Sequence, residues 1–346
     1  MALSGQAFSP KEFIVAVGAQ TALGTAKTDA MYAMDVDSVT HGTLGGINQY
    51  DIKSGGGRIL QDEHYFHLNE GYTSEITVSG TYATTFGIEL IENITGSTSE
   101  VWTIPSNYEP RTDLIAGVTG LNAGDNALLT VAILPPVVGG ATPSATEGIL
   151  YKDCVVTNVS LSGDMSDGGV VKYSATFKTY SPVALEVDGS GYTISDYSTA
   201  HYINMNKWQT PARRIIAGVD DLIVNSFAFT IDNDAVFSGH GSSGVTEAIS
   251  RQGELSVTAD FNVKYDAESA QLLNVFQSAT TGATTGATLM SNASTPATGA
   301  NWGFSMPQTV LTNVALSEGD IMGIDASVKM VGYGVGETTT VLTLAD

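Results

Sequence analysis

Hydrophobic and polar residues alternate along several short stretches of the chain. The longest stretch covers residues 255–263, where Leu, Val, Ala, Phe and Val are each separated by one polar residue. Successive side chains of a β-strand point to opposite faces of the sheet, so this period of two predicts a strand with one buried and one polar face. Residues 76–82 repeat the pattern, with Ile76, Val78 and Tyr82 on the apolar face. We therefore expect a mainly β fold.

A pair of such stretches occurs twice. Residues 157–162 read Thr-Asn-Val-Ser-Leu-Ser and residues 312–317 read Thr-Asn-Val-Ala-Leu-Ser, so the shift is 312 − 157 = 155 positions. Each copy leads into a Gly-Asp turn and then into a second alternating run, at residues 173–178 and 324–329. Each copy thus predicts a β-hairpin, and the repetition predicts two related domains.

An earlier pair of segments matches in the same order. Residues 75–79 correspond to residues 254–258, and both continue into a stretch of helical character. In the second copy Asp266 is suited to cap a helix whose apolar residues share one face: Leu272, Val275 and Phe276. The match extends this expectation to residues 88–94 of the first copy, where propensity alone favours a strand. Each domain is therefore expected to carry one short helix beside its strands.

The chain has 346 residues and is long enough for two domains that each bury a core. We place the boundary near residue 200, in a linker at residues 187–211 that contains two glycines and a proline. The first domain then covers residues 1–199 and the second covers residues 200–346. Their cores are expected over about residues 30–185 and about residues 215–335.

The two copies differ mainly between helix and hairpin. The first copy has an insertion at about residues 95–150, and we expect its strand-like part at residues 127–134 to form an extra hairpin or loop at the surface. In the second copy residues 278–300 are almost all Ala, Thr, Gly and Ser, which predicts a mobile loop. Ahead of each core, residues 47–60 and 223–237 are expected to form long protruding hairpins, the second turning at its Asp-Asn-Asp sequence.

The charge balance is strongly acidic. Aspartate and glutamate number 36 against 14 lysines and arginines, which gives a net charge of −22. A protein that binds nucleic acid tightly neutralises phosphates with Lys and Arg, so this composition argues against tight DNA binding. The acidity suits a surface that repels DNA, and it also suits a salty environment in which acidic residues aid solubility. The carboxylates are scattered along the chain, so a solvated acidic surface accounts for them equally well.

Features that report on the cell compartment are few. Cys154 is the only cysteine, so an intrachain disulfide is impossible, and its place at a strand start predicts a small buried side chain. Residues 1–11 lack the basic and apolar segments of a signal peptide, and no stretch reaches the roughly 18 apolar residues of a membrane span. Asn93 begins a glycosylation sequence, but nothing directs the chain to a secretory pathway. We expect a protein that is made in the cytoplasm and is not bound to a membrane.

No catalytic motif stands out. His64 and His67 have no third ligand nearby and would point to opposite faces of a strand, which disfavours a zinc site. The glycines at residues 239–244 fit a dinucleotide-binding pattern, but that pattern needs a parallel βαβ unit, which the sequence does not predict. Paired carboxylates are expected to lie in exposed turns: Asp62 with Glu63, and Asp232 with Asp234. We therefore expect no enzyme activity, no cofactor and no metal site.

Two copies of strand, helix and hairpin in an acidic, cysteine-poor chain resemble the tail tube proteins of long-tailed bacteriophages, of the siphovirus type. The segments that carry the resemblance are the first hairpin (155–164 with 173–178), the second hairpin (310–320 with 324–329) and residues 260–276. The resemblance covers most of the two cores given above.

The resemblance implies a β-sandwich or half-barrel with a flanking helix in each domain, and an inner sheet that joins those of its neighbours. In that family six such domains close a ring, so three chains with a duplicated domain would form one ring with pseudo-sixfold symmetry. The rings stack into the tail tube of the virion, which is assembled in the host cytoplasm. The implied partners are other copies of the chain and other tail proteins, such as the tape measure, terminator and distal tail proteins. Double-stranded DNA would pass through the lumen without specific binding.

Six residues at polar positions of the alternating strands are expected to face the lumen: Thr77, Thr81, Thr258, Asp260, Asn262 and Asp325. Carboxylates on an acidic lumen wall would repel phosphates within a screening length of about 10 Å at 0.1 M salt. The pattern does not indicate which sheet faces inward. The alternative from another class is a β-sandwich binding module, such as a capsid decoration or receptor-binding protein. Such modules more often present aromatic pockets, whereas the aromatic residues of this chain fall at core spacing.

Overall fold

A computed structural model describes the following residues: 13–21, 24–42, 47–49, 65–67, 74–95, 101–105, 128–135, 148–179, 181–195, 202–205, 214–233, 235–240, 246–251, 256–278, 284–290, 303–318, 322–331 and 340–345. Strands make up most of them, which confirms the expected mainly β fold. The two expected helices are also present, as α1 (Thr84–Thr95) and α2 (Ala270–Ser278).

The strands before residue 200 are β1 (Ile14–Ala19), β2 (Met31–Met34), β3 (Ser38–His41), β4 (Ile47–Gln49), β5 (Tyr65–His67), β6 (Ser74–Thr81), β7 (Val101–Pro105), β8 (Leu129–Leu134), β9 (Gly148–Asp164), β10 (Val171–Thr179), β11 (Ala184–Val187) and β12 (Ile194–Ser195). Those after it are β13 (Arg214–Ile215), β14 (Val224–Asp232), β15 (Ala235–His240), β16 (Thr246–Arg251), β17 (Ser256–Lys264), β18 (Thr284–Met290), β19 (Gly303–Ser317), β20 (Gly323–Met330) and β21 (Thr340–Ala345). Short 3₁₀ turns cover Met165–Asp167 and Gly189–Gly191.

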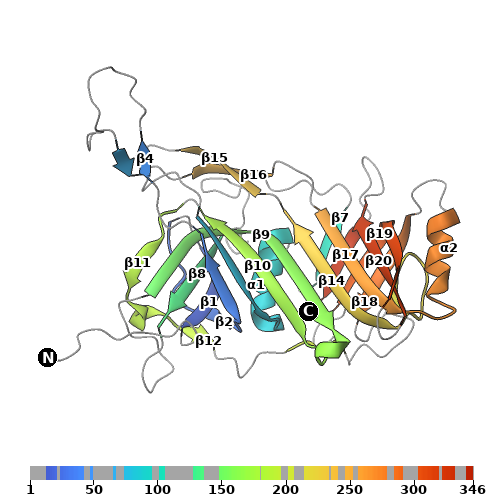
Figure 1. The fold of residues 1–346 in the computed structure, drawn as a ribbon. Helices are drawn as coiled ribbons and strands as arrows, with labels where there is room; N and C mark the ends of the chain where they lie inside the picture. Colours follow the sequence, from blue (N-terminus) through green and yellow to red (C-terminus); the bar gives the residue numbers. More distant parts are fainter. Residues whose placement is uncertain are drawn as a thin grey trace, which may run out of the picture.

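Eight strands form one antiparallel sheet that runs across the molecule in the order β3-β6-β10-β9-β14-β17-β20-β19 (Figure 1). The first four strands precede residue 200 and the last four follow it, and the pair β9–β14 joins the two groups. Along β10 and β17 buried residues alternate strictly with partly buried or exposed ones. One face of this sheet is therefore apolar and buried, and the other is polar.

The strand β9 is 17 residues long and belongs to two layers. Its first part pairs with β8 and β11, whereas its second part pairs with β10 and β14. Asp153, with a positive φ of 54°, lies at the irregularity of the β8–β9 pair, just before β9 changes partners. β1 and β2 extend the second layer beyond β8. The strand β19 also changes partners along its length: its first part pairs with β18 and β21, and its last part pairs with β20.

The helix α1 fills the space behind the eight-stranded sheet (Figure 1). Its apolar residues are almost fully buried in the core: Phe86, Leu90, Ile91 and Ile94. Asn93 is only 5% exposed, and its Oδ1 accepts a hydrogen bond of 2.7 Å from the backbone N of Val156 in β9. The side chain that begins the glycosylation sequence thus anchors the helix to the sheet and is not presented to solvent.

The two matching hairpins share their register. Leu161 lies opposite Tyr173 in the β9–β10 pair, and Leu316 lies opposite Ile324 in the β19–β20 pair, in keeping with the shift of 155 positions along β9 and β19. Each pair has a β-bulge, which leaves one threonine without an opposite residue. The Oγ1 atoms of these threonines each donate to a carbonyl of the facing strand: Thr157 to Thr176 at 3.3 Å, and Thr312 to Ser327 at 3.0 Å.

The register corrects the sequence alignment of the preceding strands. Ile76 lies opposite Phe177, and Ala259 lies opposite Val328. Phe177 and Val328 are equivalent, because each lies opposite the residue just before the bulged threonine of its hairpin. Ile76 therefore corresponds to Ala259, and not to Leu255 as the sequence match has it. The error of four residues is a multiple of two, which is why the predicted faces of both strands are nevertheless correct.

Three expectations about the connecting segments were wrong. Residues 127–134 contain β8, which is buried along its whole length and pairs with β1 and β9, so this segment is part of the core and not a surface hairpin. The expected mobile loop at residues 278–300 contains β18, which pairs with β19. β14 and β15 do not pair with each other across the Asp-Asn-Asp sequence, because β14 lies between β9 and β17 and β15 pairs with β16.

The insertion at residues 95–150 also contributes β7, which pairs with β21 near the end of the chain. Together with the β9–β14 pair, this contact crosses the expected boundary near residue 200. Two separate hairpins, β4–β5 and β15–β16, lie on the same side of the eight-stranded sheet (Figure 1). Each follows the first strand of its four-strand group and precedes the second.

Candidate functional surface: the polar face and free edges of the sheet

Serine and threonine residues dominate the polar face of the eight-stranded sheet. One row of hydroxyl residues crosses six adjacent strands, from β3 to β17, with each residue opposite the next: Ser38, Ser79, Ser174, Ser160, Thr230 and Thr258. Two neighbouring pairs in the row are hydrogen-bonded: the Oγ atoms of Ser38 and Ser79 are 2.7 Å apart, and Oγ1 of Thr230 donates to Oγ of Ser160 at 3.2 Å. Short hydroxyl side chains therefore cover this face, and cross-strand pairs of them hydrogen-bond to one another.

All six residues expected from the sequence at a lumen lie on this polar face. Thr77 and Thr81 come from β6, Thr258, Asp260 and Asn262 from β17, and Asp325 from β20. The amide Nδ2 of Asn262 donates to Oδ1 of Asp325 at 2.6 Å and to Oγ of Ser317 at 3.0 Å. In β6 the Oγ1 atom of Thr77 lies 3.1 Å from that of Thr176. The alternation of polar residues thus identified a continuous surface, and the register links its members.

The charges on this face nearly cancel. Among the described strand positions it carries four lysines (Lys172, Lys178, Lys264 and Lys329) and five carboxylates (Glu75, Asp164, Asp232, Asp260 and Asp325), so the difference is 4 − 5 = −1. Two of the lysines form ion pairs, with Nζ–carboxylate distances of 3.1 Å for Lys172–Asp37 and 3.8 Å for Lys178–Glu75. The acidity of the chain therefore does not accumulate on these strands.

Both ends of the sheet leave a strand edge open. Among the described residues, β3 pairs only with β6, and residues 311–317 of β19 pair only with β20. An open strand edge carries unpaired N–H and C=O groups, which makes it a template for another strand. Neither edge was evident from the sequence, because strand order depends on tertiary pairing.

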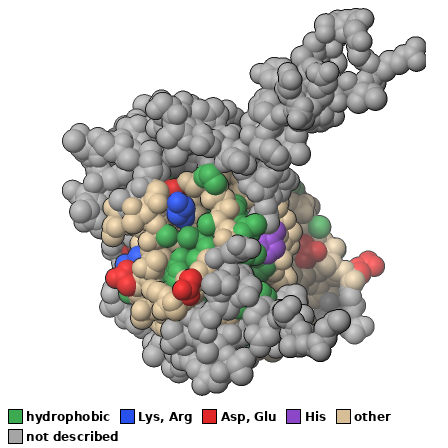
Figure 2. All heavy atoms as spheres, turned by 90° about the vertical axis from the view of Figure 1, so that its left-hand side faces the viewer, with side chains coloured by type: hydrophobic (Ala, Val, Ile, Leu, Met, Phe, Trp, Pro, Cys, Tyr) green, Lys and Arg blue, Asp and Glu red, His purple; other side chains and the backbone are tan. Residues whose placement is uncertain are grey.

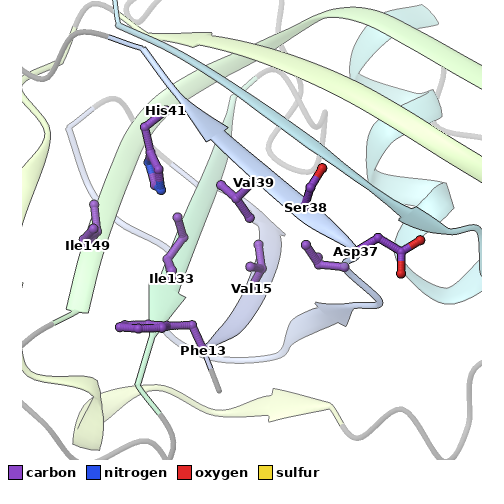
Figure 3. A pocket seen from close by; sticks show the side chains of 9 residues that line it. Phe13, Val15, Asp37, Ser38, Val39, His41, Ile133 and Ile149 are labelled. Atoms are coloured by element: carbon purple, nitrogen blue, oxygen red, sulfur yellow. The ribbon is translucent and has the colours of Figure 1, made fainter. Parts of the chain in front are cut away.

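A cavity of about 330 Å³ opens beside β3 and is lined mainly by apolar side chains: Phe13, Val15, Val36, Val39, Ile133 and Ile149, with Asp37, Ser38 and His41 at its margin. Figure 2 shows hydrophobic side chains gathered on this face of the molecule. In Figure 3, Val39 and His41 come from one strand and lie above Ile133, whereas the carboxylate of Asp37 points away from the cavity.

His41 lies at the rim of this cavity. Its Nδ1 atom is 2.8 Å from the hydroxyl oxygen of Tyr151, and the two rings stack with centroids 6.1 Å apart. Partial burial lowers the pKa of the imidazole below its ordinary value, because desolvation disfavours the charged form. No local pattern in the sequence predicts this site, because its residues come from segments that are far apart along the chain.

Two observations on the described residues concern metal binding and thiol chemistry. They contain no group of three or more His, Cys, Asp or Glu side chains placed to hold a metal ion. Cys154 is buried as expected, and burial raises the pKa of its thiol, so the reactive thiolate is disfavoured. The side chains of His64 and His67, the Asp62–Glu63 pair and most of the glycine-rich segment at 239–244 lie outside the described residues.

No protein-family model matches the chain, and no curated protein matches its sequence. In the described part of the chain, neither helix has the length and apolar composition needed to cross a bilayer. The longer one, α1, has 12 residues, whereas a span needs about 20. A functional proposal therefore rests on the geometry of the eight-stranded sheet.

Proposed function

We propose that this chain is a structural virion protein that forms the tail tube of a long-tailed bacteriophage. The observation that carries the proposal is an eight-stranded sheet with a polar, hydroxyl-rich face and, within the described chain, an open strand edge at each end. The backbone groups of the two edge strands are paired only when another strand binds each edge. If the sheet closes into a ring with other copies of the chain, both edges are paired at once.

The internal arrangement favours a closed ring. The two four-strand groups, β3-β6-β10-β9 and β14-β17-β20-β19, have the same strand order and the same register in their hairpins. This supports a duplicated tube domain in which β9–β14 is one junction of the ring and the open edges form the next. A contact between one surface and a different one repeats the same rotation at each junction, and it gives a ring when that rotation closes on itself.

The size of such a ring is compatible with a DNA conduit. Three chains would contribute about 24 strands, eight from each chain. With a spacing of about 4.8 Å and a tilt of about 40°, 24 strands enclose a backbone circle roughly 50 Å across. Side chains on the inner wall narrow this channel, and what remains is wider than a DNA duplex.

The polar face is the natural lining of this channel, since the apolar face packs against α1 and the second layer. Its charges nearly cancel among the described positions, so we propose a wall that is hydrated by hydroxyl groups, with little net charge. Two of its four lysines are paired with carboxylates, which leaves few sites for phosphate. DNA would therefore pass without specific binding, and the acidic residues elsewhere contribute to the field of the whole tube.

Electron microscopy of the purified full-length chain tests the proposal. Negative-stain images at increasing protein concentration are expected to show rings and stacked hollow tubes, and light scattering is expected to show mass growing in multiples of a ring. The same preparation is expected to retain no duplex DNA in a filter-binding assay at 0.1 M salt. Monomers at every concentration would contradict the proposal, and specific attachment of those monomers to capsids or cells would favour a decoration or receptor-binding protein.

A further inference from the structure

The junction between β9 and β14 shows how two four-strand groups meet. Phe229 of β14 lies opposite Leu161 of β9, and their exposed fractions are 0% and 1%. The ring of Phe229 stacks on that of Phe304 in β19, with centroids 4.4 Å apart and an angle of 21°. An aromatic residue and a leucine thus close this junction on the apolar face of the sheet.

The leucine has a counterpart at the open edge of β19. Leu161 and Leu316 each lie four residues after the bulged threonine of their strand and opposite the equivalent residue of the facing strand. Leu316 is nevertheless 49% exposed. The difference arises because β14 covers the edge of β9, whereas no strand covers residues 311–317 of β19 within the described chain.

The aromatic residue has a counterpart at the open edge of β3. This strand pairs with β6 as β14 pairs with β17. In the first group, Phe177 of β10 lies opposite Ile76 of β6, which lies opposite His41 of β3. In the second group, the equivalent residue Val328 of β20 lies opposite Ala259 of β17, which lies opposite Phe229 of β14. His41 therefore holds the place in β3 that Phe229 holds in β14.

The surroundings of the two rings agree with this correspondence. His41 stacks on Tyr151 in the first part of β9, at an angle of 23°, and Phe229 stacks on Phe304 in the first part of β19. Both long strands thus supply an aromatic ring beneath the equivalent position. His41 is only partly covered, whereas Phe229 is fully buried. The free edge of β3 lacks the leucine that lies opposite Phe229 at the internal junction.

We infer that the β19 edge of one copy pairs with the β3 edge of a second copy in the register of the internal junction, with Leu316 opposite His41 and Ser317 opposite Thr40. Antiparallel pairing in this register continues both faces of the sheet. Leu316 then covers the mouth of the apolar cavity beside β3, and Ser317 and Thr40 continue the hydroxyl surface. The inference rests on the proposed function, and it adds the partner segment and its register.

The second copy fits this edge better than an unrelated strand does for two reasons. The internal junction already joins the equivalent strands of the same chain, in the same direction and with the same leucine. The cavity of about 330 Å³ beside His41 and the exposed Leu316 are also complementary, since each is apolar and each lies on the apolar face of its edge strand. Covering both removes apolar surface from water, which favours the contact.

A pair of engineered cysteines tests the register. In Thr40→Cys/Ser317→Cys, mild oxidation of the assembled protein is expected to give chains linked by disulfides on a non-reducing gel. A bond within one chain is excluded, since the two edges are seven strand spacings apart, about 34 Å, and a disulfide needs Cα atoms within about 7 Å. The matched control is Thr40→Cys/Asn313→Cys. Asn313 lies on the same polar face of β19 as Ser317, but it is four residues, about 13 Å, away from the position opposite Thr40. Cys154 is buried and does not interfere.

The outcomes separate the inference from the proposed function. Linked chains from the Ser317 pair but not from the Asn313 pair would support the register. Rings or tubes that link equally in both pairs, only in the Asn313 pair or in neither would overturn the register and leave the proposed function standing. A protein that stays monomeric by microscopy and scattering, whichever pair it carries, would overturn both.

Truncation of the leucine tests the contact itself. Leu316→Ala is expected to raise the protein concentration needed for half-maximal assembly about tenfold, because it removes much of the apolar surface that would be buried. Ile223→Ala is the matched control, since Ile223 is 40% exposed but directly precedes β14, which lies between β9 and β17 in the middle of the sheet. Circular dichroism establishes that both variants are folded. Equal assembly of the two folded variants would refute a role for Leu316 in the contact.

Discussion

The β9–β14 junction is expected to hold the two halves of the chain together through Phe229. This side chain is fully buried and stacks on Phe304, while Leu161 faces it from β9. Phe→Ala substitutions in cores cost about 3–5 kcal/mol, and the upper part of that range applies here because strands on both sides prevent the space from collapsing. Loss of the stacked pair accounts for about 0.5–1.5 kcal/mol of that cost. Phe229→Ala should thus remove a large part of a total stability of about 5–15 kcal/mol.

Urea unfolding followed by circular dichroism measures this effect at a fixed protein concentration. Phe276→Ala serves as the control, because Phe276 is 41% exposed on α2 and its truncation should cost less than about 1 kcal/mol. In the double variant with Leu161→Ala, the two costs should couple by about 0.5–3 kcal/mol, since the residues share one junction. A cost for Phe229→Ala that equals that of Phe276→Ala would refute the view that this junction joins the halves.

Three further predictions concern buried or partly buried polar groups. The side chain of Asp153 accepts hydrogen bonds from Gln20 Nε2 (2.9 Å), Gly24 N (2.8 Å) and Ser181 Oγ, and its backbone has a positive φ of 54°. Asp153→Ala should therefore lower the free energy of unfolding by about 3–5 kcal/mol, and Asp153→Asn by less. The Cys154 thiol, whose pKa is raised by burial, should react with a thiol reagent at pH 8 only after unfolding. Because burial lowers the pKa of His41, the unfolded chain binds its proton more readily, so stability should fall as the pH drops below about 6.5, and less so in His41→Gln.

The alternation of residues was enough to predict the sheet that carries the candidate surface. β17 and β6 have one polar and one apolar face as expected, and the six proposed lumen residues therefore share a face. The alternation could not show the strand order, because which edges remain open depends on pairings between segments that are far apart. The cavity beside β3 was not predicted for this reason, since its lining comes from segments as distant as Phe13 and Ile149.

Two segments were predicted wrongly, β8 as a surface hairpin or loop and β18 as a mobile loop, and each error has a physical explanation. β8 is buried on both faces, so its residues show no period of two and resemble any short apolar run. β18 consists of Thr, Gly, Ala, Leu and Met, and its small residues suggest a linker, yet pairing with β19 and β13 makes it a strand. β8 pairs with the first part of β9, and β18 pairs with the first part of β19. A comparison of the two halves of the chain could therefore have predicted β18, whereas its local pattern could not.

The distribution of charge bears on how such a chain avoids premature association. The two edges that no described strand covers and the exposed Leu316 favour pairing with other copies, which is a liability for a freshly made chain. Its net charge of −22 opposes that pairing, since copies with like charge repel over a screening length of about 10 Å at 0.1 M salt. The described strands of the polar face contribute only −1 to this charge, so the repulsion originates elsewhere and does not prevent the strands from aligning once two edges meet. Added salt should therefore promote assembly by weakening the repulsion while leaving the apolar contact at Leu316 intact.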